Sequence, residues 1–391
     1  MDFAISQQIA DDVSKNLATR ERYYFVDVLN IVSSFAVVAL QVSLGVFSPS
    51  MDASWVKSVA FQAAAIFAVP VFFMISGMNL LGYRERYSTT HFFLNRFRRV
   101  GVSLLAGSLL FYFLYSTFPA YFYSANLIAS SSGAIDFVIR LLGNRINDTY
   151  WFLYSILYLY LVTPLFSLAI SDKRLMRYLI CLSCFASVIV PLCKTFLPID
   201  DLGINQLFSL TRFNSICAFY YLLGGYIGRY RTFLDDISAP LCAVGYFVCT
   251  CAMIIWGLTS NGYFSGCVAE GYNSYPISIS SPLCVAQSLF LLHLLKKEEI
   301  KLRALPVEVQ SVIKKLSGAA LYVYLIHILL VNLQPVGKMT LVHRIINHSP
   351  GIKLILVYLI SVAIGVFVLD MRRRMFAVKI KRCDNQNQSN E

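Results

Sequence analysis

Residues Tyr24–Phe47 read YFVDVLNIVSSFAVVALQVSLGVF, and this stretch decides the fold class. A helix crosses a hydrocarbon layer of about 30 Å with roughly 20 mostly apolar residues, because each residue adds about 1.5 Å along the axis. The stretch is long enough to do so before Pro49, where a helix would break. It therefore predicts a first membrane-spanning helix.

Three polar side chains, Asp27, Asn30 and Gln41, lie within this apolar stretch. Their spacings of three and eleven residues bring all three to one face of a helix. A carboxylate and two amides are costly against lipid, so this face should point into the protein interior or a wet cavity. A purely structural role is the alternative, since amides often bridge membrane helices and an Asp near a helix start can pair with an Arg.

The composition places the whole chain in the membrane. Of its 391 residues, 57% are hydrophobic and only 14% are charged, against about 25% charged in soluble domains. We expect an all-α, polytopic fold with ten spans. The predicted spans are Tyr24–Phe47, Val56–Leu81, Val100–Pro119, Tyr150–Ile170, Leu175–Leu197, Phe213–Tyr230, Pro240–Leu258, Ile277–Leu295, Gly318–Pro335 and Ile352–Leu369.

The distribution of positive charge predicts the orientation. With these ten spans, 25 of the 33 Lys and Arg residues fall on the side of the N-terminus. Because cytoplasmic loops of membrane proteins carry excess Lys and Arg, both termini should be cytoplasmic. The net charge of +12 is then a feature of topology and not of nucleic-acid binding. We expect an N-terminal tail (1–23), a ten-helix domain (24–370) and a basic, then polar, C-terminal tail (371–391).

The longest predicted outer connection, Ala120 to Thr149, contains the segment IDFVIRLLGN. Its apolar residues follow the spacing of one helical face, which predicts a short amphipathic helix on the membrane or over a cavity mouth.

Several further residues could carry chemistry. In the second span, Pro70 should kink the helix, and Ser76-Gly77 would allow close helix packing or ligand access. Arg96, Arg98 and Arg99 precede the third span and could bind phosphates, although such a basic run often marks topology alone.

Aromatic and histidine residues add candidates in later spans. Trp151 and Tyr154 begin the fourth span, where an interfacial aromatic belt is the simpler interpretation and sugar binding the alternative. His327 lies within the ninth span and His293 within the eighth. A membrane-buried imidazole is often a satisfied interhelical contact, yet it can also mark a functional site. The sequence contains no nucleophile elbow, phosphate-binding loop or zinc-protease motif, and we predict no metal.

Taken in order, five segments resemble the membrane acyltransferase family three, which includes bacterial O-acetyltransferases of surface polysaccharides. They are YYFVDVLNIVSSFAVVALQVSL, VPVFFMISGMNLL, RFRRV, YWFLYSILYLYLVTPLF and YLIH. The resemblance implies a cytosolic acyl-coenzyme A donor, most simply acetyl-coenzyme A, as co-substrate with no bound cofactor. It also implies that Arg96 and Arg99 match the conserved cytoplasmic arginine pair of the family.

The first helix departs from the family pattern. The family carries Asp, then Arg three residues on, then a His eleven residues later that is taken as the catalytic base, whereas this chain has Asn30 and Gln41 in the last two places. A glutamine cannot accept a proton as an imidazole does, and losing a general base typically costs 10²–10⁴-fold in rate. Three outcomes are open. Another residue such as His327 or Asp27 could serve as the base, positioning alone could sustain slow transfer, or the activity could be lost.

The expected function is transfer of an acyl group to a hydroxyl of a cell-envelope or exopolysaccharide sugar, in the bacterial cytoplasmic membrane. Expected partners are the lipid bilayer, acyl-coenzyme A, an envelope glycan or lipid-linked sugar, and envelope-biosynthesis proteins. The candidate residues are Gln41, Asn30, Asp27 and His327 for catalysis, Arg96, Arg98 and Arg99 for the donor, and Ser76, Trp151 and Tyr154 for the acceptor. The alternatives are a transporter or flippase of polysaccharide precursors and a catalytically degenerate partner of an envelope complex.

Overall fold

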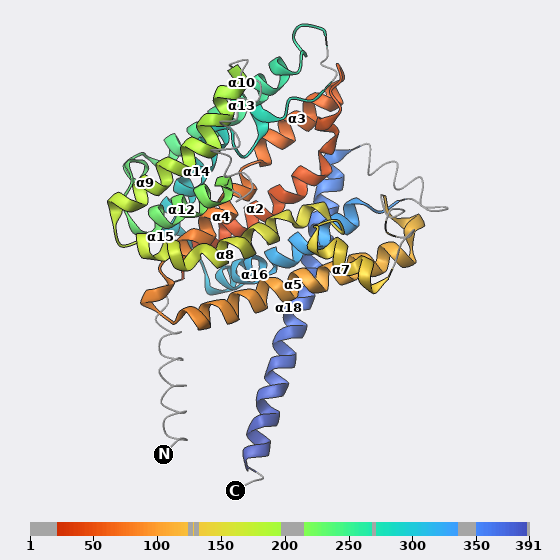
Figure 1. Cartoon of the computed structure of the whole chain (residues 1–391), viewed down its shortest axis with the longest axis vertical. Coiled ribbons are helices and arrows are strands. Elements are labelled where there is room, and N and C mark those ends of the chain that lie inside the picture. Colours follow the sequence, from red (N-terminus) through yellow and green to blue (C-terminus); the bar gives the residue numbers. More distant parts are fainter. Residues whose placement is uncertain are drawn as a thin grey trace.

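The computed structural model describes residues 22–123, 128, 133–196, 215–267, 271–334 and 349–388, with the side chains of the last helix described as far as Arg374. Figure 1 shows a bundle of helices from which the last helix, in blue, projects downward. Within these ranges the β pairing is one isolated bridge between Phe122 and Leu333.

Helices make up nearly all of the regular structure. They are α2 (Tyr24–Val42), α3 (Ala53–Ala65), α4 (Ala68–Leu80), α5 (Thr89–Thr117), α7 (Ala134–Leu142), α8 (Trp151–Ala169), α9 (Lys173–Cys184), α10 (Val190–Phe196), α12 (Ser215–Arg229), α13 (Ala239–Ser260), α14 (Pro282–Lys297), α15 (Glu299–Arg303), α16 (Val307–Val331) and α18 (Pro350–Gln388). Short 3₁₀ or π turns join several of them, among them η5 (Phe185–Ile189) and η7 (Phe233–Asp235).

The predicted all-α membrane architecture is confirmed. Nine segments of the described chain are long and apolar enough to cross a membrane. The sixth predicted span, Phe213–Tyr230, corresponds to α12, of which 15 residues are described. Arg22, before α2, and Arg373, near the end of the apolar part of α18, line the same cavity, so these two ends lie on one side of the molecule. That this side is cytoplasmic remains a prediction.

Proline residues divide two of the predicted spans. The second span, Val56–Leu81, consists of α3 and α4, which meet at Ile66 and Phe67. Pro70 lacks the N–H that would bond the Ile66 carbonyl four residues earlier, and its ring crowds that carbonyl, so the break falls there. In the fifth span the π turn η5 lies just before Pro191 for the same reason.

The tightest helix contact joins α4 and α12. Gly77 of α4 faces the backbone of Tyr221, and a Cβ at position 77 would lie 1.8 Å from the Tyr221 carbonyl oxygen. Gly224 of α12 faces Met74 in the same way, at 2.1 Å from the Met74 carbonyl oxygen. The two backbones can approach this closely only because both positions lack a side chain.

The amphipathic helix predicted in the outer connection is present as α7. Its apolar face, which includes Ile135 and Leu142, is exposed, with 79% and 78% of these residues accessible. The polar face turns to the protein, where Asp136 pairs with Arg140 and accepts a hydrogen bond from Tyr112 of α5. This orientation favours contact between the apolar face and the bilayer surface.

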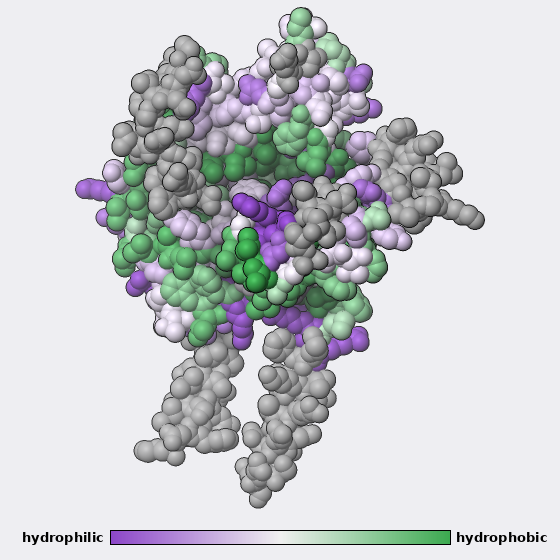
Figure 2. All heavy atoms as spheres, turned by 45° about the vertical axis from the view of Figure 1, so that its right-hand side comes forward, coloured by the Kyte–Doolittle hydropathy of each residue, from purple (hydrophilic) through white to green (hydrophobic). Residues whose placement is uncertain are grey.

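The molecular surface is also divided into apolar and polar regions. Figure 2 shows hydrophobic residues over a broad part of the face in view, with hydrophilic residues gathered at the lower edge, near the top and in one central patch. Large apolar side chains of α5 and α18, such as Leu105, Leu109 and Ile355, are exposed on the outside of the bundle. Such a surface is expected where lipid is the solvent.

The α4–α12 contact predicts a marked difference between two glycine substitutions. Gly77→Ala should force the two backbones apart and cost about 1–3 kcal/mol or more, as overpacking usually does. Gly101→Ala in α5 is the matched control, because a Cβ there meets nothing within 4 Å. The measurement is the apparent unfolding temperature in detergent, followed by size-exclusion chromatography after heating. Equal stability of the two variants would contradict the close contact.

Candidate functional site

A cavity of about 650 Å³ lies between α2, α4, α5, α8, α16 and α18, at the side of the molecule where α2 begins. Positive side chains dominate its charged lining. They are Arg22, Arg96, Arg99, Lys314 and Arg373. Among the charged groups that line it, Asp27 is the one carboxylate. A site with five cations and one carboxylate favours a ligand that carries several negative charges.

Asp27 is buried in the wall of this cavity, with 6% of the residue exposed. Arg22, half-exposed at the start of the described chain, binds it with both arms of its guanidinium group. The Nε–Oδ2 and Nη2–Oδ1 distances are 2.7 and 2.8 Å. Two parallel, charge-assisted hydrogen bonds of this kind neutralise a carboxylate that membrane burial would otherwise strongly destabilise. The polar face of α2 thus begins with an ion pair at the start of the helix.

Uncharged polar groups lie deeper in the cavity. Asn30, one turn beyond Asp27, donates a hydrogen bond from Nδ2 to Oγ of Ser317 on α16 at 3.3 Å. Ser76 of α4 lines the same cavity, and Asn79 lines it near the end of α4. These groups can orient a carbonyl or amide of a bound molecule.

The inner part of the cavity is aromatic. Phe72, Phe152 and Tyr324 line it, whereas Tyr160 lies beside Phe97 of α5. The rings of Phe152 and Tyr324 are 5.4 Å apart, and the Tyr324 hydroxyl donates a hydrogen bond to the Thr149 carbonyl oxygen. The cavity therefore combines a cationic part with an apolar part, which suits a ligand with a charged head and a less polar arm.

The cavity unites five of the residues predicted from the sequence. They are Asp27, Asn30, Ser76, Arg96 and Arg99. They come from α2 and α4, which pack against each other, and from α5, which packs on α8 and α16.

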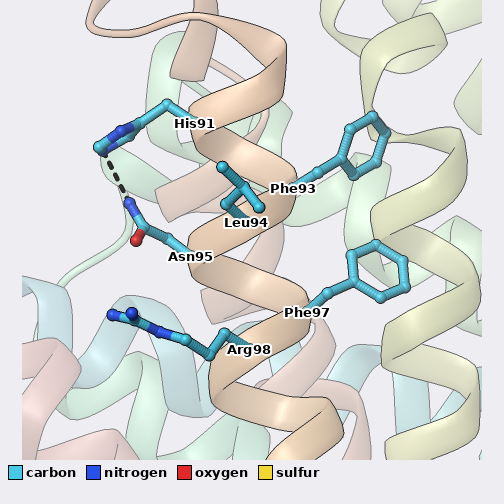
Figure 3. A pocket seen from close by; sticks show the side chains of 6 residues that line it. All are labelled: His91, Phe93, Leu94, Asn95, Phe97 and Arg98. Carbon is cyan, nitrogen blue, oxygen red and sulfur yellow. Dashed lines mark hydrogen bonds between the residues drawn. The ribbon is translucent and has the colours of Figure 1, made fainter.

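Arg98, predicted to act with Arg96 and Arg99, lies elsewhere. Positions 96 and 99 are three residues apart and share the cavity face of α5, whereas position 98 points to the opposite side. Figure 3 shows Arg98, Asn95 and His91 on one side of the helix and Phe93 and Phe97 on the other. Arg98 and His91 are exposed there, and Asn95 Nδ2 donates to His91 Nε2 at 2.7 Å.

Two predicted acceptor residues are also outside the cavity lining. Trp151 is 38% exposed at the start of α8, as an interfacial residue would be. The Tyr154 hydroxyl donates to the Leu141 carbonyl oxygen at the end of α7 and so ties α7 to α8. Phe152 and Ile156, on a neighbouring face of α8, line the cavity instead.

Gln41 and His327 lie beyond the cavity, toward the opposite side of the molecule. Gln41 is the second-last residue of α2, about 16 Å along the helix from Asn30 at 1.5 Å per residue. His327 is about 15 Å beyond Ser317 along α16. The two helices run in the same direction, because Tyr24 bonds Gln310 and Asn30 bonds Ser317. Gln41 and His327 therefore reach a similar depth.

The ring of His327 is fully buried, 5.9 Å from the ring of Tyr324. Its Nδ1 is 3.0 Å from the Val323 carbonyl oxygen, which can only accept, so Nδ1 carries the proton. Nε2 is then an unprotonated acceptor in the neutral ring, and within the described chain it has no hydrogen-bond partner. Such a nitrogen is chemically able to take a proton.

Sequence reasoning missed several residues of the cavity, among them Arg22, Lys314, Ser317 and Arg373. Arg22 lies in the predicted tail, five residues before Asp27, and this spacing could have suggested a pair across the helix start. Lys314 and Arg373 lie at the ends of spans that a sequence alone does not place beside α2. Groups of three or more His, Cys, Asp or Glu suited to a metal are absent from the described residues.

Comparison with known families gives one match. A family model described as "Acyltransferase domain" matches residues 23–370, which is most of the chain. Comparisons with curated proteins and with solved structures found no match.

The ion pair on α2 predicts a compensating pair of substitutions. Arg22→Ala should leave the Asp27 carboxylate buried without its partner, and the cost should be about 1–3 kcal/mol, since Arg22 is partly solvated. Adding Asp27→Asn removes the uncompensated charge and should recover most of this loss. The apparent unfolding temperature of the two single variants and the double variant in detergent measures the coupling. Purely additive losses would show that the two side chains act independently.

Proposed function

The chain belongs to this acyltransferase family, and we propose that it transfers an acetyl group from acetyl-coenzyme A to a hydroxyl group of a cell-envelope or exopolysaccharide sugar. The observation that carries the proposal is the cavity with five cations and one paired carboxylate. Coenzyme A bears several phosphate charges at one end, which match the cationic part of the cavity. Its thioester is carried on a long, less polar arm, which matches the apolar part.

In this proposal, the phosphates bind at the outer, cationic part of the cavity. Arg96 and Arg99 lie one turn apart on α5, so their guanidinium groups can bind neighbouring phosphate oxygens. Arg22, Lys314 and Arg373 add positive charge from three other parts of the chain. This mixture of origins supports a preformed site and not a basic run that only sets topology.

The less polar arm would pass Asn30 and Ser76, and the thioester would lie at the aromatic end beside Tyr324, whose ring is 5.9 Å from that of His327. The side chains of Asn30 and Ser76 can donate hydrogen bonds to carbonyl oxygens of the amide groups along the arm. Rings of Phe72, Phe152 and Tyr324 would surround the arm and exclude water. Water exclusion favours transfer to the sugar over hydrolysis of the thioester.

His327 is the base that we propose for the acceptor hydroxyl. Its free Nε2 lies at the depth where the family places the helix-one histidine, which is Gln41 in this chain. The hydroxyl oxygen would attack the thioester carbon while Nε2 takes the proton, the carbon–sulfur bond would break, and the leaving thiolate would regain a proton from the imidazolium. The products are the sugar ester and coenzyme A. Gln41 would orient the acceptor by hydrogen bonds.

The second candidate is a chain that has lost transferase activity. It is favoured by Gln41 and Asn30, which replace the expected histidine and arginine. A chain of this kind would still bind the donor or an envelope partner. Turnover separates the two possibilities, whereas donor binding does not.

Donor binding should distinguish the three arginines of α5. Arg96→Ala and Arg99→Ala should each weaken coenzyme A binding about tenfold, since one lost charge-assisted hydrogen bond is worth about 1.5 kcal/mol. Arg98→Ala removes the same charge from the opposite face and should change the dissociation constant less than about twofold. Equilibrium binding of coenzyme A to the detergent-purified chain measures all three. Equal losses in the three variants would indicate a diffuse charge effect and not a phosphate site.

Turnover should depend on the two residues at the deeper level. With labelled acetyl-coenzyme A in purified membranes, His327→Gln should lower kcat about 10²–10⁴-fold, because no titratable nitrogen remains. Gln41→Ala should reduce transfer, and Gln41→His should raise it by adding an imidazole. His91→Gln, on the exposed face of α5, is the control and should behave as the native chain.

Two outcomes would argue against catalysis in the native chain. A silent native chain with activity in Gln41→His would indicate a decayed transferase. Silence in every variant would favour a transporter or a binding partner of an envelope complex.

A further inference from the structure

We propose that Glu299 is a positioning residue of the donor cavity: from the connection between α14 and α16 it holds the first turn of α2 and so fixes where Arg22 meets the donor. The inference rests on the proposed function of the cavity. Glu299 itself does not line the cavity, so any effect on the donor must pass through α2.

The first turn of α2 has no cap of its own. Tyr23 occupies the capping position, and its side chain makes no capping hydrogen bond. The carboxylate of Glu299, 275 residues further along the chain, caps this turn instead. Its Oε1 accepts from the Tyr24 amide at 3.2 Å and its Oε2 from the Phe25 amide at 2.8 Å. These are N–H groups that a helix cannot satisfy internally, and a negative charge at this end also favours the helix dipole.

Arg303 extends the same contact to the residues just before α2. Its Nε donates to Oε1 of Glu299 at 2.7 Å, and its guanidinium group lies 5.7 Å from the centre of the Tyr23 ring. Its Nη2 donates to the carbonyl oxygen of Arg22 at 3.4 Å. One Glu–Arg pair on α15 therefore holds the backbone at Arg22, Tyr24 and Phe25.

The position of this backbone directly affects the lining of the cavity. Arg22 is the residue whose side chain binds Asp27 and lines the cavity, and it precedes the helix that carries Asn30. A loosened first turn would let the guanidinium group sample positions away from the donor phosphates. Binding depends on this placement, because a charge held in position costs less conformational entropy on ligand binding.

The connection that carries Glu299 is itself anchored. Lys296 Nζ is 2.8 Å from the Oδ1 atom of Asp235 in η7, and Lys297 Nζ donates to the Asp235 carbonyl oxygen at 2.7 Å. Partial burial opposes ionisation of Asp235, yet the hydrogen bonds from Lys296 and Thr232 outweigh it and lower its pKa to about 2. The anchor is therefore fully ionised at physiological pH, and the end of α14 presents Glu299 from a fixed point.

Electrostatics and positioning predict opposite effects of removing Glu299. A carboxylate beside a cationic cavity repels phosphates, so its loss should tighten donor binding if charge alone mattered. If Glu299 positions Arg22, its loss should weaken donor binding. Glu298 provides the matched control, since it carries the same charge one residue earlier and bonds Lys301 of its own helix at 2.8 Å.

The test compares Glu299→Ala, Glu299→Gln and Glu298→Ala with the native chain, by coenzyme A binding and by acetyl transfer at saturating acceptor. We expect Glu299→Ala to raise the dissociation constant and the KM for the donor about tenfold, with kcat within about twofold of native. Glu299→Gln keeps one acceptor oxygen and should fall between. Glu298→Ala should leave both constants unchanged or slightly lower. Loss of folded protein alone would reduce apparent kcat and leave the KM unchanged.

Hydrogen–deuterium exchange of the first turn of α2 supplies a readout besides activity, and it should rise in Glu299→Ala and not in Glu298→Ala. Native or tighter donor binding in Glu299→Ala would overturn the inference while the proposed function stands. No coenzyme A binding by the native chain would overturn the proposed function and, with it, the inference.

Discussion

The structure depends on a constraint that the membrane places on Asp27. A buried carboxylate is tolerated there only with a partner, and the partner is Arg22, which binds both of its oxygens. Contacts with α15 and α16 then hold α2 in the bundle, where Asn30 reaches Ser317 one turn beyond Asp27. The guanidinium group also adds to the positive lining of the cavity. One ion pair thus connects the stability of the first helix with the electrostatics of the candidate site.

A guanidinium group near Asp27 also bears on the departure from the family pattern. Where the resemblance implies an Arg three residues after the Asp, this chain has Asn30, and the arginine that binds the carboxylate precedes the helix. In this chain the positive partner of the carboxylate therefore comes from outside the helix. Gln41 has no titratable residue beside it near the end of α2, and a titratable candidate at a similar depth, His327, lies on another helix.

Length and hydropathy were sufficient to predict the all-α membrane fold, because a spanning helix must satisfy its own backbone and be apolar over about 20 residues. Helical phase was sufficient to bring Asp27 and Asn30 to one face of α2. It was not applied to Arg98, which two residues from Arg96 points to the other side of α5. Tyr154 and Trp151 could not be placed from sequence, since which face of α8 meets the cavity depends on α7 and α16. The contribution of Lys314 and Arg373 depends on tertiary packing between distant spans, and no local pattern encodes it.

The glycine contact between α4 and α12 has a consequence for how the cavity can change shape. Two helices whose backbones touch at Gly77 and Gly224 cannot slide or separate without breaking that contact, so they move as one rigid unit. Ser76, next to Gly77, therefore stands on an immobile wall. The opposite walls, α5 and α18, bury only 28% and 22% of their spanning windows within the protein. Any widening of the cavity would therefore require movement of these two lipid-facing helices, and the surrounding bilayer would take part in it.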